Sequence, residues 1–179
     1  MHNIMNIGYT PEVCTCCGQT TTYILGIDQG TVDIVKAVSI AIQRKGINMI
    51  HPWKEMQAPK SKLDYVTITL EGLLTPMQLT NLSRARAHGL IAHVHDQHGN
   101  YCMTTKGAQF LNGCEIDRYA IMSKSEGHQI GYFEPGKHMV TVKSFQRKGE
   151  PYWQGINYDI IEGRIITELP IPTKQATLL

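Results

Sequence analysis

The sequence predicts an α+β fold, and two features of its 179 residues predict it. Apolar residues recur three and four positions apart at Ile34, Val38 and Ile42, which is the spacing of one buried helical face. After Gly113 the chain changes to short runs rich in β-branched and aromatic residues, separated by glycine and proline turns. These runs, expected as strands of an antiparallel β extension, cover residues 119–122, 128–133, 138–145 and 163–169.

A cysteine-rich turn, CTCCG at residues 14–18, stands in the N-terminal arm, residues 1–30. Cys14 and Cys17 have the spacing of a zinc knuckle, in which a turn points two thiolates at one ion and the next glycine opens the backbone toward sulfur. A structural zinc needs four ligands, so the others would come from another cysteine, a histidine or a second chain. The remaining cysteines are Cys16, Cys102 and Cys114. Two alternatives stay open: small thiols that fill a turn, or a redox pair.

The first helix is expected over 32–45, with Thr31 or Asp33 as its N-cap. It follows a β-rich run, TTTYILGI at residues 20–27, which predicts a strand. Residues 47–73 contain two prolines and then the alternating run YVTITL. A short second helix and an inserted strand are therefore both open in that segment.

The stretch from Leu74 to Gly113 predicts a helix, a strand, a turn, a second strand and a short helix. Thr75 suits the N-cap of the first helix and Pro76 its first position, where no backbone N–H is needed. Gly89 can take the left-handed conformation that ends this helix after His88. The later elements are strands over 90–94 and 101–104 and a short helix that Thr104 or Thr105 caps.

The segments NLSRARAHGLI and YCMTTKGAQFLNG resemble the recognition helix and wing of a winged helix-turn-helix domain. Together with CTCCG they are similar to small phage-encoded proteins of unassigned function that combine a Cys-x-x-Cys-Gly knuckle with a winged helix. The resemblance implies a cysteine knuckle in the N-terminal arm and a nucleic-acid-binding winged-helix domain over roughly residues 31–113. The expected units are 1–30 for the arm, 31–113 for the winged helix, 114–170 for the β-rich extension and 171–179 for a tail.

The expected DNA-binding residues lie on the outward face of the helix Pro76–His88. Arginine can bridge the O6 and N7 atoms of guanine, and asparagine or glutamine the N6 and N7 atoms of adenine. Lysine at the start of the short helix suits a phosphate contact. Residues 31–113 also hold nine basic and five acidic side chains, a surplus that favours a polyanionic partner. The candidates are Gln78, Thr80, Asn81, Arg84, His88 and Lys106.

The sequence predicts a non-enzymatic protein, because it contains no P-loop and no GxGxxG, GxSxG or HExxH motif. The leading hypothesis is duplex DNA binding, as a transcriptional or replication regulator of a phage or bacterium. The alternative is a phage-type interaction protein that binds and modulates a host protein through its winged helix or β extension. Salt dependence separates the two, since phosphate contacts weaken steeply with salt and an apolar protein interface does not.

The chain has no recognisable signal peptide and no apolar run of the roughly 20 residues that cross a bilayer. We therefore expect a cytoplasmic protein, in the host cell if it is phage-encoded, with no membrane partner. In that compartment cysteines are free or metal-bound rather than paired in disulfides. The β extension is a candidate for pairing with a second copy, as a homodimer.

Overall fold

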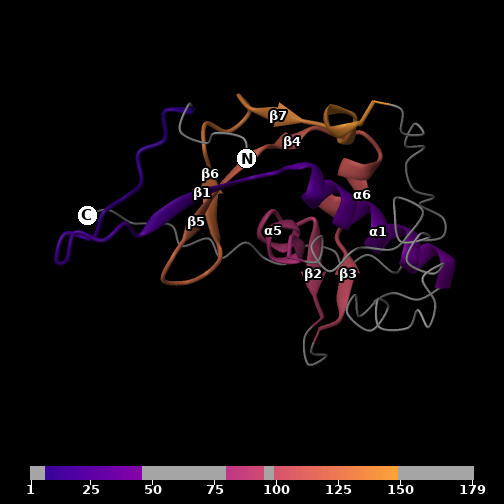
Figure 1. Cartoon of the computed structure of the whole chain (residues 1–179), viewed down its shortest axis with the longest axis horizontal. Helices are drawn as coiled ribbons and strands as arrows, with labels where there is room; N and C mark the ends of the chain where they lie inside the picture. The colour runs from indigo at the N-terminus through magenta and orange to yellow at the C-terminus, as the bar shows by residue number, and fades with distance from the viewer. Residues whose placement is uncertain (1–6, 46–79, 95–98, 149–179) are drawn as a thin grey trace.

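The computed structural model describes residues 7–45, 80–94 and 99–148, and these form a mixed α+β structure. Three α-helices lie with three small antiparallel sheets in this part of the chain (Figure 1). The α+β class is therefore confirmed. The winged helix-turn-helix stays a prediction, because its second helix is expected within residues 47–73, outside the described ones.

The largest sheet joins the N-terminal arm to the C-terminal part of the chain. Strand β1 (Thr22–Gly26) pairs antiparallel with β5 (Tyr119–Ser123), which pairs antiparallel with β6 (Gln129–Tyr132). The register places Ile24 opposite Ile121. The strand expected over 20–27 is confirmed, and it finds its partner almost a hundred residues later in the chain.

Helix α1 (Gln29–Lys45) begins earlier than the expected residue 32. The prediction that Thr31 or Asp33 caps it is wrong. Asp28 is the cap, because its Oδ1 accepts hydrogen bonds from the backbone N–H of Thr31 at 2.9 Å and from the Thr31 hydroxyl at 2.7 Å. Gly30 lies in the first turn of α1 beside the Asn81 side chain, and a Cβ there would lie 2.4 Å from Nδ2 of Asn81. The glycine thus allows α1 to approach the start of the next described helix.

The central motif follows the expected order of helix, hairpin and short helix. Helix α5 (Leu82–Ala87) leads into β2 (Ile91–His93), which pairs antiparallel with β3 (Tyr101–Met103) before α6 (Thr105–Leu111). Gly89 ends α5 with φ +67°, as predicted. Thr104 caps α6 by accepting the Gly107 N–H at 2.9 Å. Residues 76–79 of the helix expected over 76–88 lie outside the described part, as do residues 95–98 of the turn.

The segment after α6 is only partly the predicted set of strands. Strand β4 (Ile116–Asp117) pairs with β7 (Met139–Val140), and the expected strand over 138–145 ends there. A 3₁₀ helix, η2 (Val142–Phe145), replaces its second half. The cause is a capping box, in which the Thr141 N–H donates to Oγ of Ser144 at 3.1 Å. The expected strand over 163–169 and the tail 171–179 lie outside the described residues.

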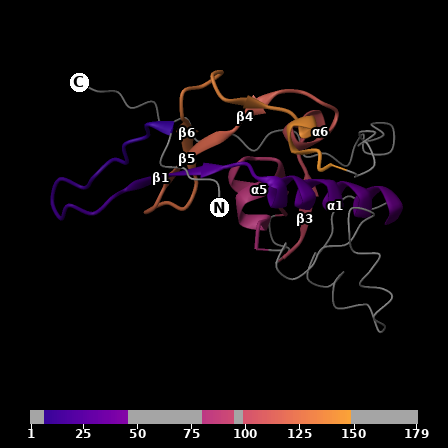
Figure 2. The same ribbon diagram turned by 45° about the horizontal axis from the view of Figure 1, so that its top comes forward.

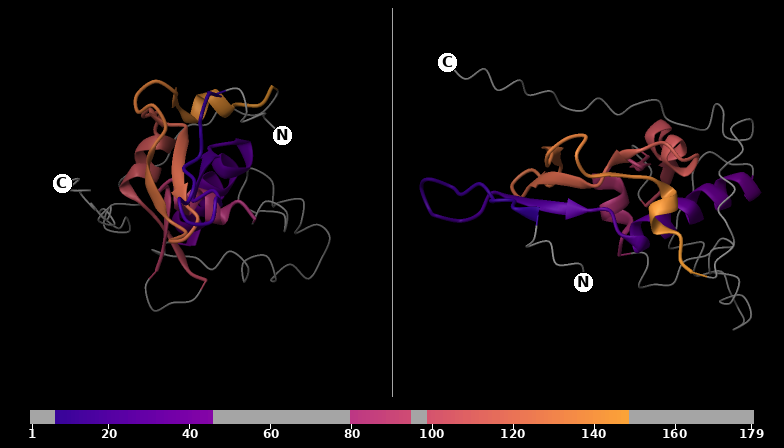
Figure 3. Two further views of the ribbon diagram at one scale, coloured as in Figure 1. Left: turned by 90° about the vertical axis from the view of Figure 1, so that its left-hand side faces the viewer. Right: turned by 90° about the horizontal axis from the view of Figure 1, so that it is seen from above.

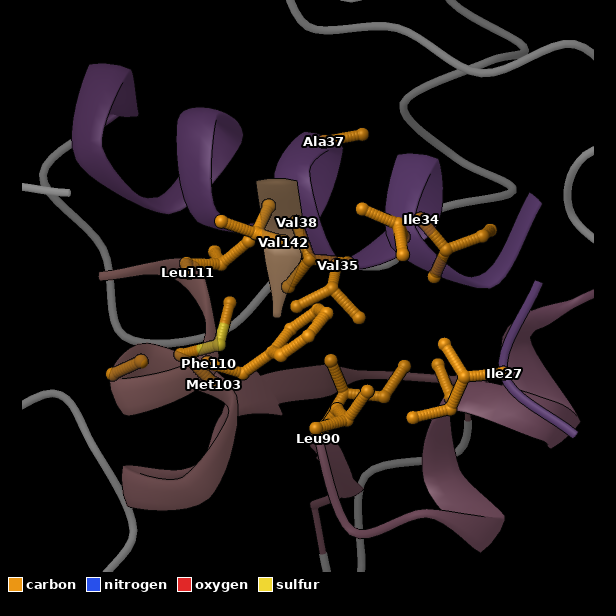
Figure 4. Close-up of a cluster of buried hydrophobic side chains, with 14 of the residues drawn as sticks. Ile27, Ile34, Val35, Ala37, Val38, Leu90, Met103, Phe110, Leu111 and Val142 are labelled. Carbon is orange, nitrogen blue, oxygen red and sulfur yellow. The ribbon is translucent and has the colours of Figure 1, made fainter. Parts of the chain in front are cut away.

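The hydrophobic core lies between α1 and the elements that follow it in the chain. Helix α1 lies across α5 and β3 (Figure 2). The ring of Phe110 from α6 stands below Val35 of α1, near Leu90 and Met103 (Figure 4). All four side chains are fully buried, and each burial of this size contributes about 1.5–3 kcal/mol to folding. The core thus holds α5 and the hairpin against a single long helix.

None of the helices within the described residues is both long enough and apolar enough to cross a lipid bilayer.

Candidate nucleic-acid interface and cysteine turn

Helix α5 presents a polar side to solvent. Thr80, Ser83 and Arg86 are exposed, and the spacing of three residues places them along one side of the helix. Leu82 and Ala85 face the core instead. The Ser83 hydroxyl donates to the Thr80 carbonyl at 3.3 Å, which continues the turn that precedes the helix. This exposed side is a short row of hydroxyl and guanidinium groups.

Thr80 and Asn81, two of the expected DNA contacts, differ in how far they are exposed to solvent. Thr80 is exposed, as predicted. Asn81 is only partly exposed, since its side-chain amide packs on the backbone at Gly30 of α1. Gln78 lies outside the described residues.

Arg84 forms an ion pair with Asp28, the cap of α1. The two side chains are 31% and 46% exposed, so the pair is open to water. Ion pairs of this kind contribute about 0–1 kcal/mol. Arg84 is therefore paired within the chain. Breaking this ion pair, so that Arg84 could contact a phosphate or a base, would cost only about 0–1 kcal/mol.

The expectation that His88 faces outward is wrong, because its side chain is fully buried. The reason is its position three residues after buried Ala85, which continues the inward stripe of α5. Neither ring nitrogen has a hydrogen-bond partner of normal geometry within the described residues. Burial, together with the positive charges of Lys106 and Arg84, lowers the pKa of His88 to about 3; the main chain of Leu25 acts in the opposite direction. His88 is thus a neutral core residue in this arrangement.

Lys106 lies at the first turn of α6 and contacts Tyr132 of β6. Its Nζ donates a hydrogen bond to the Tyr132 hydroxyl and lies 4.7 Å from the ring centroid. A cation–π contact at a partly exposed site contributes about 0.5–1 kcal/mol. The side chain predicted to bind phosphate is therefore already held against the three-stranded sheet.

The β2–β3 hairpin extends away from the helices beside α5 (Figure 3, left). Its last described backbone bond joins the Val94 N–H to the Asn100 carbonyl at 2.9 Å. His93 accepts the Gly99 N–H at its Nε2 at 3.2 Å and meets the ring of Tyr101 edge-on, with centroids 5.4 Å apart. These contacts hold the two strands of the hairpin together near its described end.

The cysteine turn is the tip of a second hairpin, in the N-terminal arm. An isolated bridge joins Val13 to Thr20, and the Cys14 N–H donates to the Gln19 carbonyl at 2.7 Å. Gly18 has φ +73°, so the backbone needs a glycine to reverse there. The reversal turns three thiols toward one another. This turn projects beyond the three-stranded sheet, away from α1 (Figure 3, right).

The sulfur atoms of Cys14, Cys16 and Cys17 all lie within 4.8 Å of one another, so this cluster could hold a metal ion. The Sγ atoms of Cys14 and Cys16 are 2.9 Å apart. The hydrogen bond from Cys16 is the largest cause that lowers the pKa of the Cys14 thiol to about 7, and the same contact raises the pKa of Cys16. Of Cys14 and Cys16, Cys14 is therefore the thiol that ionises first.

Two residues gain importance that the sequence alone did not assign. Arg86 was not among the predicted DNA contacts, yet it is exposed near the end of α5. Cys16 was one of several candidate third ligands, and the turn places its sulfur in the group. The adjacency of Cys16 and Cys17 was the available signal for Cys16.

Comparison with protein families, with curated proteins and with solved structures found no match for this chain. Its function is therefore inferred from its own geometry and chemistry.

Proposed function

We propose that this protein is a non-enzymatic duplex-DNA-binding protein, a transcriptional or replication regulator, that contacts DNA through α5 and the β2–β3 hairpin. The observation that carries the proposal is the exposed row of Thr80, Ser83 and Arg86 on a helix followed directly by a projecting hairpin. Hydroxyl and guanidinium groups are the side chains that most often meet phosphate oxygens and guanine edges.

The internal contacts of Arg84 and Lys106 are compatible with this role. Each is a partly exposed contact of about 1 kcal/mol or less. Release of either side chain therefore costs no more than the roughly 1–3 kcal/mol that one good base contact supplies. We expect Arg86 to make the first phosphate contact and Arg84 to exchange Asp28 for DNA.

The test is fluorescence anisotropy of the full chain on random-sequence duplex DNA at about 50 mM and about 200 mM salt. Wild-type binding should weaken steeply with salt, and Arg86→Ala should weaken it about tenfold at low salt. The matched control is Lys137→Ala, which removes the same charge from an exposed side chain beside Glu134 and should bind like the wild type. Equal binding by both variants, or no binding at low salt, would exclude α5 as the DNA-binding helix.

A second candidate is the interaction protein that binds a host protein. The observation that favours it is Ile130, a large apolar side chain 48% exposed on β6, which is an outer strand among the described strands of its sheet. Outer strands accept extended peptides through backbone hydrogen bonds, while side-chain pockets give specificity. Partner binding that persists at moderate salt and is lost in Ile130→Asp would support this candidate over DNA binding.

Zinc is the proposed ion of the cysteine turn. Thiolates prefer soft or borderline ions, and zinc is the usual ion of cysteine turns closed by glycine. Cys14 and Cys17, the two ligands expected from the spacing, lie in the same group of sulfurs. Zinc retained by the purified protein, and lost on chelation, would support this assignment.

A further inference from the structure

The three sulfurs of the cysteine turn are already arranged for a single ion. In a tetrahedral zinc site with Zn–S bonds of about 2.3 Å, neighbouring sulfurs lie about 3.8 Å apart. All three Sγ atoms lie within 4.8 Å of one another, and Cys14 and Cys16, at 2.9 Å, need to separate by about 1 Å. Cys16 and Cys17 are exposed, so their side chains have room to adjust toward a shared ion.

The chain does not supply a fourth thiolate to this group. It has five cysteines, and all five lie within the described residues. Cys102 is buried in β3, where its thiol donates to the Ala92 carbonyl at 3.4 Å. Cys114 is exposed after α6 but does not belong to the group. In the part of the chain that the structure describes, the cluster consists of three ligands.

We infer that Cys14, Cys16 and Cys17 form a three-thiolate site for one Zn²⁺ ion, whose fourth position faces solvent and takes an exchangeable oxygen or nitrogen ligand. The inference rests on the proposed zinc binding and names its ligand set. It differs from a knuckle in which two cysteines of the turn combine with two distant ligands. The turn stands at the end of a projecting hairpin, so an incoming ligand can reach the ion (Figure 3, right).

The charge of the site separates it from the DNA-binding surface. Three thiolates and one Zn²⁺ carry a net charge of about −1 when the fourth ligand is neutral. Residues 1–30 contain no lysine or arginine, and Lys124, a cation held near the turn, donates to the Thr20 hydroxyl instead of to a cysteine. A phosphate would be repelled at close range, whereas water or a neutral imidazole can complete the tetrahedron. The expected fourth ligand is therefore neutral.

The experiment is zinc-edge X-ray absorption on the full-length, zinc-loaded, reduced protein, with a parallel Cd²⁺ titration that follows the ultraviolet absorption of Cd–thiolate bonds. The wild type should show one ion per chain with three sulfur ligands at about 2.3 Å and one lighter ligand. Cys16→Ser should lower the Cd–thiolate absorption by about one third, because one of three Cd–S bonds is lost, and should weaken metal affinity at least about tenfold. Cys114→Ser, another exposed cysteine outside the group, is the matched control and should match the wild type.

The outcomes separate the inference from the zinc proposal on which it rests. If the wild type binds neither Zn²⁺ nor Cd²⁺, the zinc proposal is wrong and the inference falls with it. If the wild type binds zinc but Cys16→Ser has unchanged absorption and affinity, Cys16 is not a ligand and only the three-thiolate set is wrong. Four sulfur ligands in the wild type would equally overturn the open fourth position, because a second chain or Cys114 would then close the site.

Discussion

Mild acid should destabilise the folded protein through His88, the buried histidine that ends α5. Its side chain is fully buried and neither ring nitrogen has a partner of normal geometry among the described residues. The pKa of His88 falls from 6.5 to about 3 in the folded state. Between these two values the unfolded chain binds a proton at this position and the folded chain does not, so stability falls as the pH falls.

The magnitude follows from the two pKa values. At about pH 7.5 the histidine is neutral in both states, and its protonation costs almost nothing. A pH of about 5 lies about 1.5 units below the pKa of 6.5 that the histidine has in the unfolded chain. Protonation of this histidine then stabilises the unfolded state by about 2 kcal/mol relative to the folded state. A domain of this size is stable by only about 5–15 kcal/mol, so this loss is readily measured.

The perturbation is His88→Leu, which retains a buried side chain of similar size and breaks no hydrogen bond of normal geometry. Urea unfolding at about pH 7.5 and about pH 5 gives the free energy of unfolding of each protein at each pH. The wild type should lose about 2 kcal/mol more than the variant on acidification, since every other titrating group is common to both. His128→Leu, which removes a half-exposed histidine beside Glu126, should retain most of the acid sensitivity. An equal loss in wild type and His88→Leu would refute the buried neutral histidine.

Two further predictions concern the packing of α6 against the hairpin. Gly107→Ala should lower the free energy of unfolding by at least about 3 kcal/mol, because the new Cβ would lie 2.0 Å from the Leu90 carbonyl oxygen; Gly131→Ala, where a Cβ meets nothing within 4 Å, should be far milder in the same urea titration. Thr104→Ala should cost about 1–2 kcal/mol, because the Thr104 hydroxyl accepts the Gly107 N–H and donates to the Gly89 carbonyl at 2.6 Å. Thr104→Ser should recover most of that loss, and a serine variant as unstable as the alanine variant would show that the methyl group matters instead.

The elements of the central motif could be predicted because their signals are local. Gly89 ends a helix and Thr104 caps one through atoms within a few residues, and both roles appear in the structure. The cap of α1 was predicted at Thr31 or Asp33 instead of Asp28, because all three side chains suit an N-cap and lie close together in the chain.

The candidate interface was predicted less well than the fold, because exposure depends on what packs against a helix. The spacing of Leu82 and Ala85 defines an inward stripe, and extending that stripe by three residues already includes His88. The pairing of Arg84 with Asp28 has no such signal, since nothing in the residues around Arg84 indicates which distant carboxylate it meets.

The amino-acid sequence was sufficient to predict the strand and helix within residues 20–45, the helix, hairpin and short helix within residues 82–111, and that three cysteines share one turn. Those properties depend on backbone preferences and side-chain spacing within about ten residues. The pairing of β1 with β5, and the engagement of Arg84 by Asp28 while Arg86 stays exposed, follow from the three-dimensional structure alone. Each of these depends on segments far apart in the chain, whose contacts form only when the shared core with α1 brings them together.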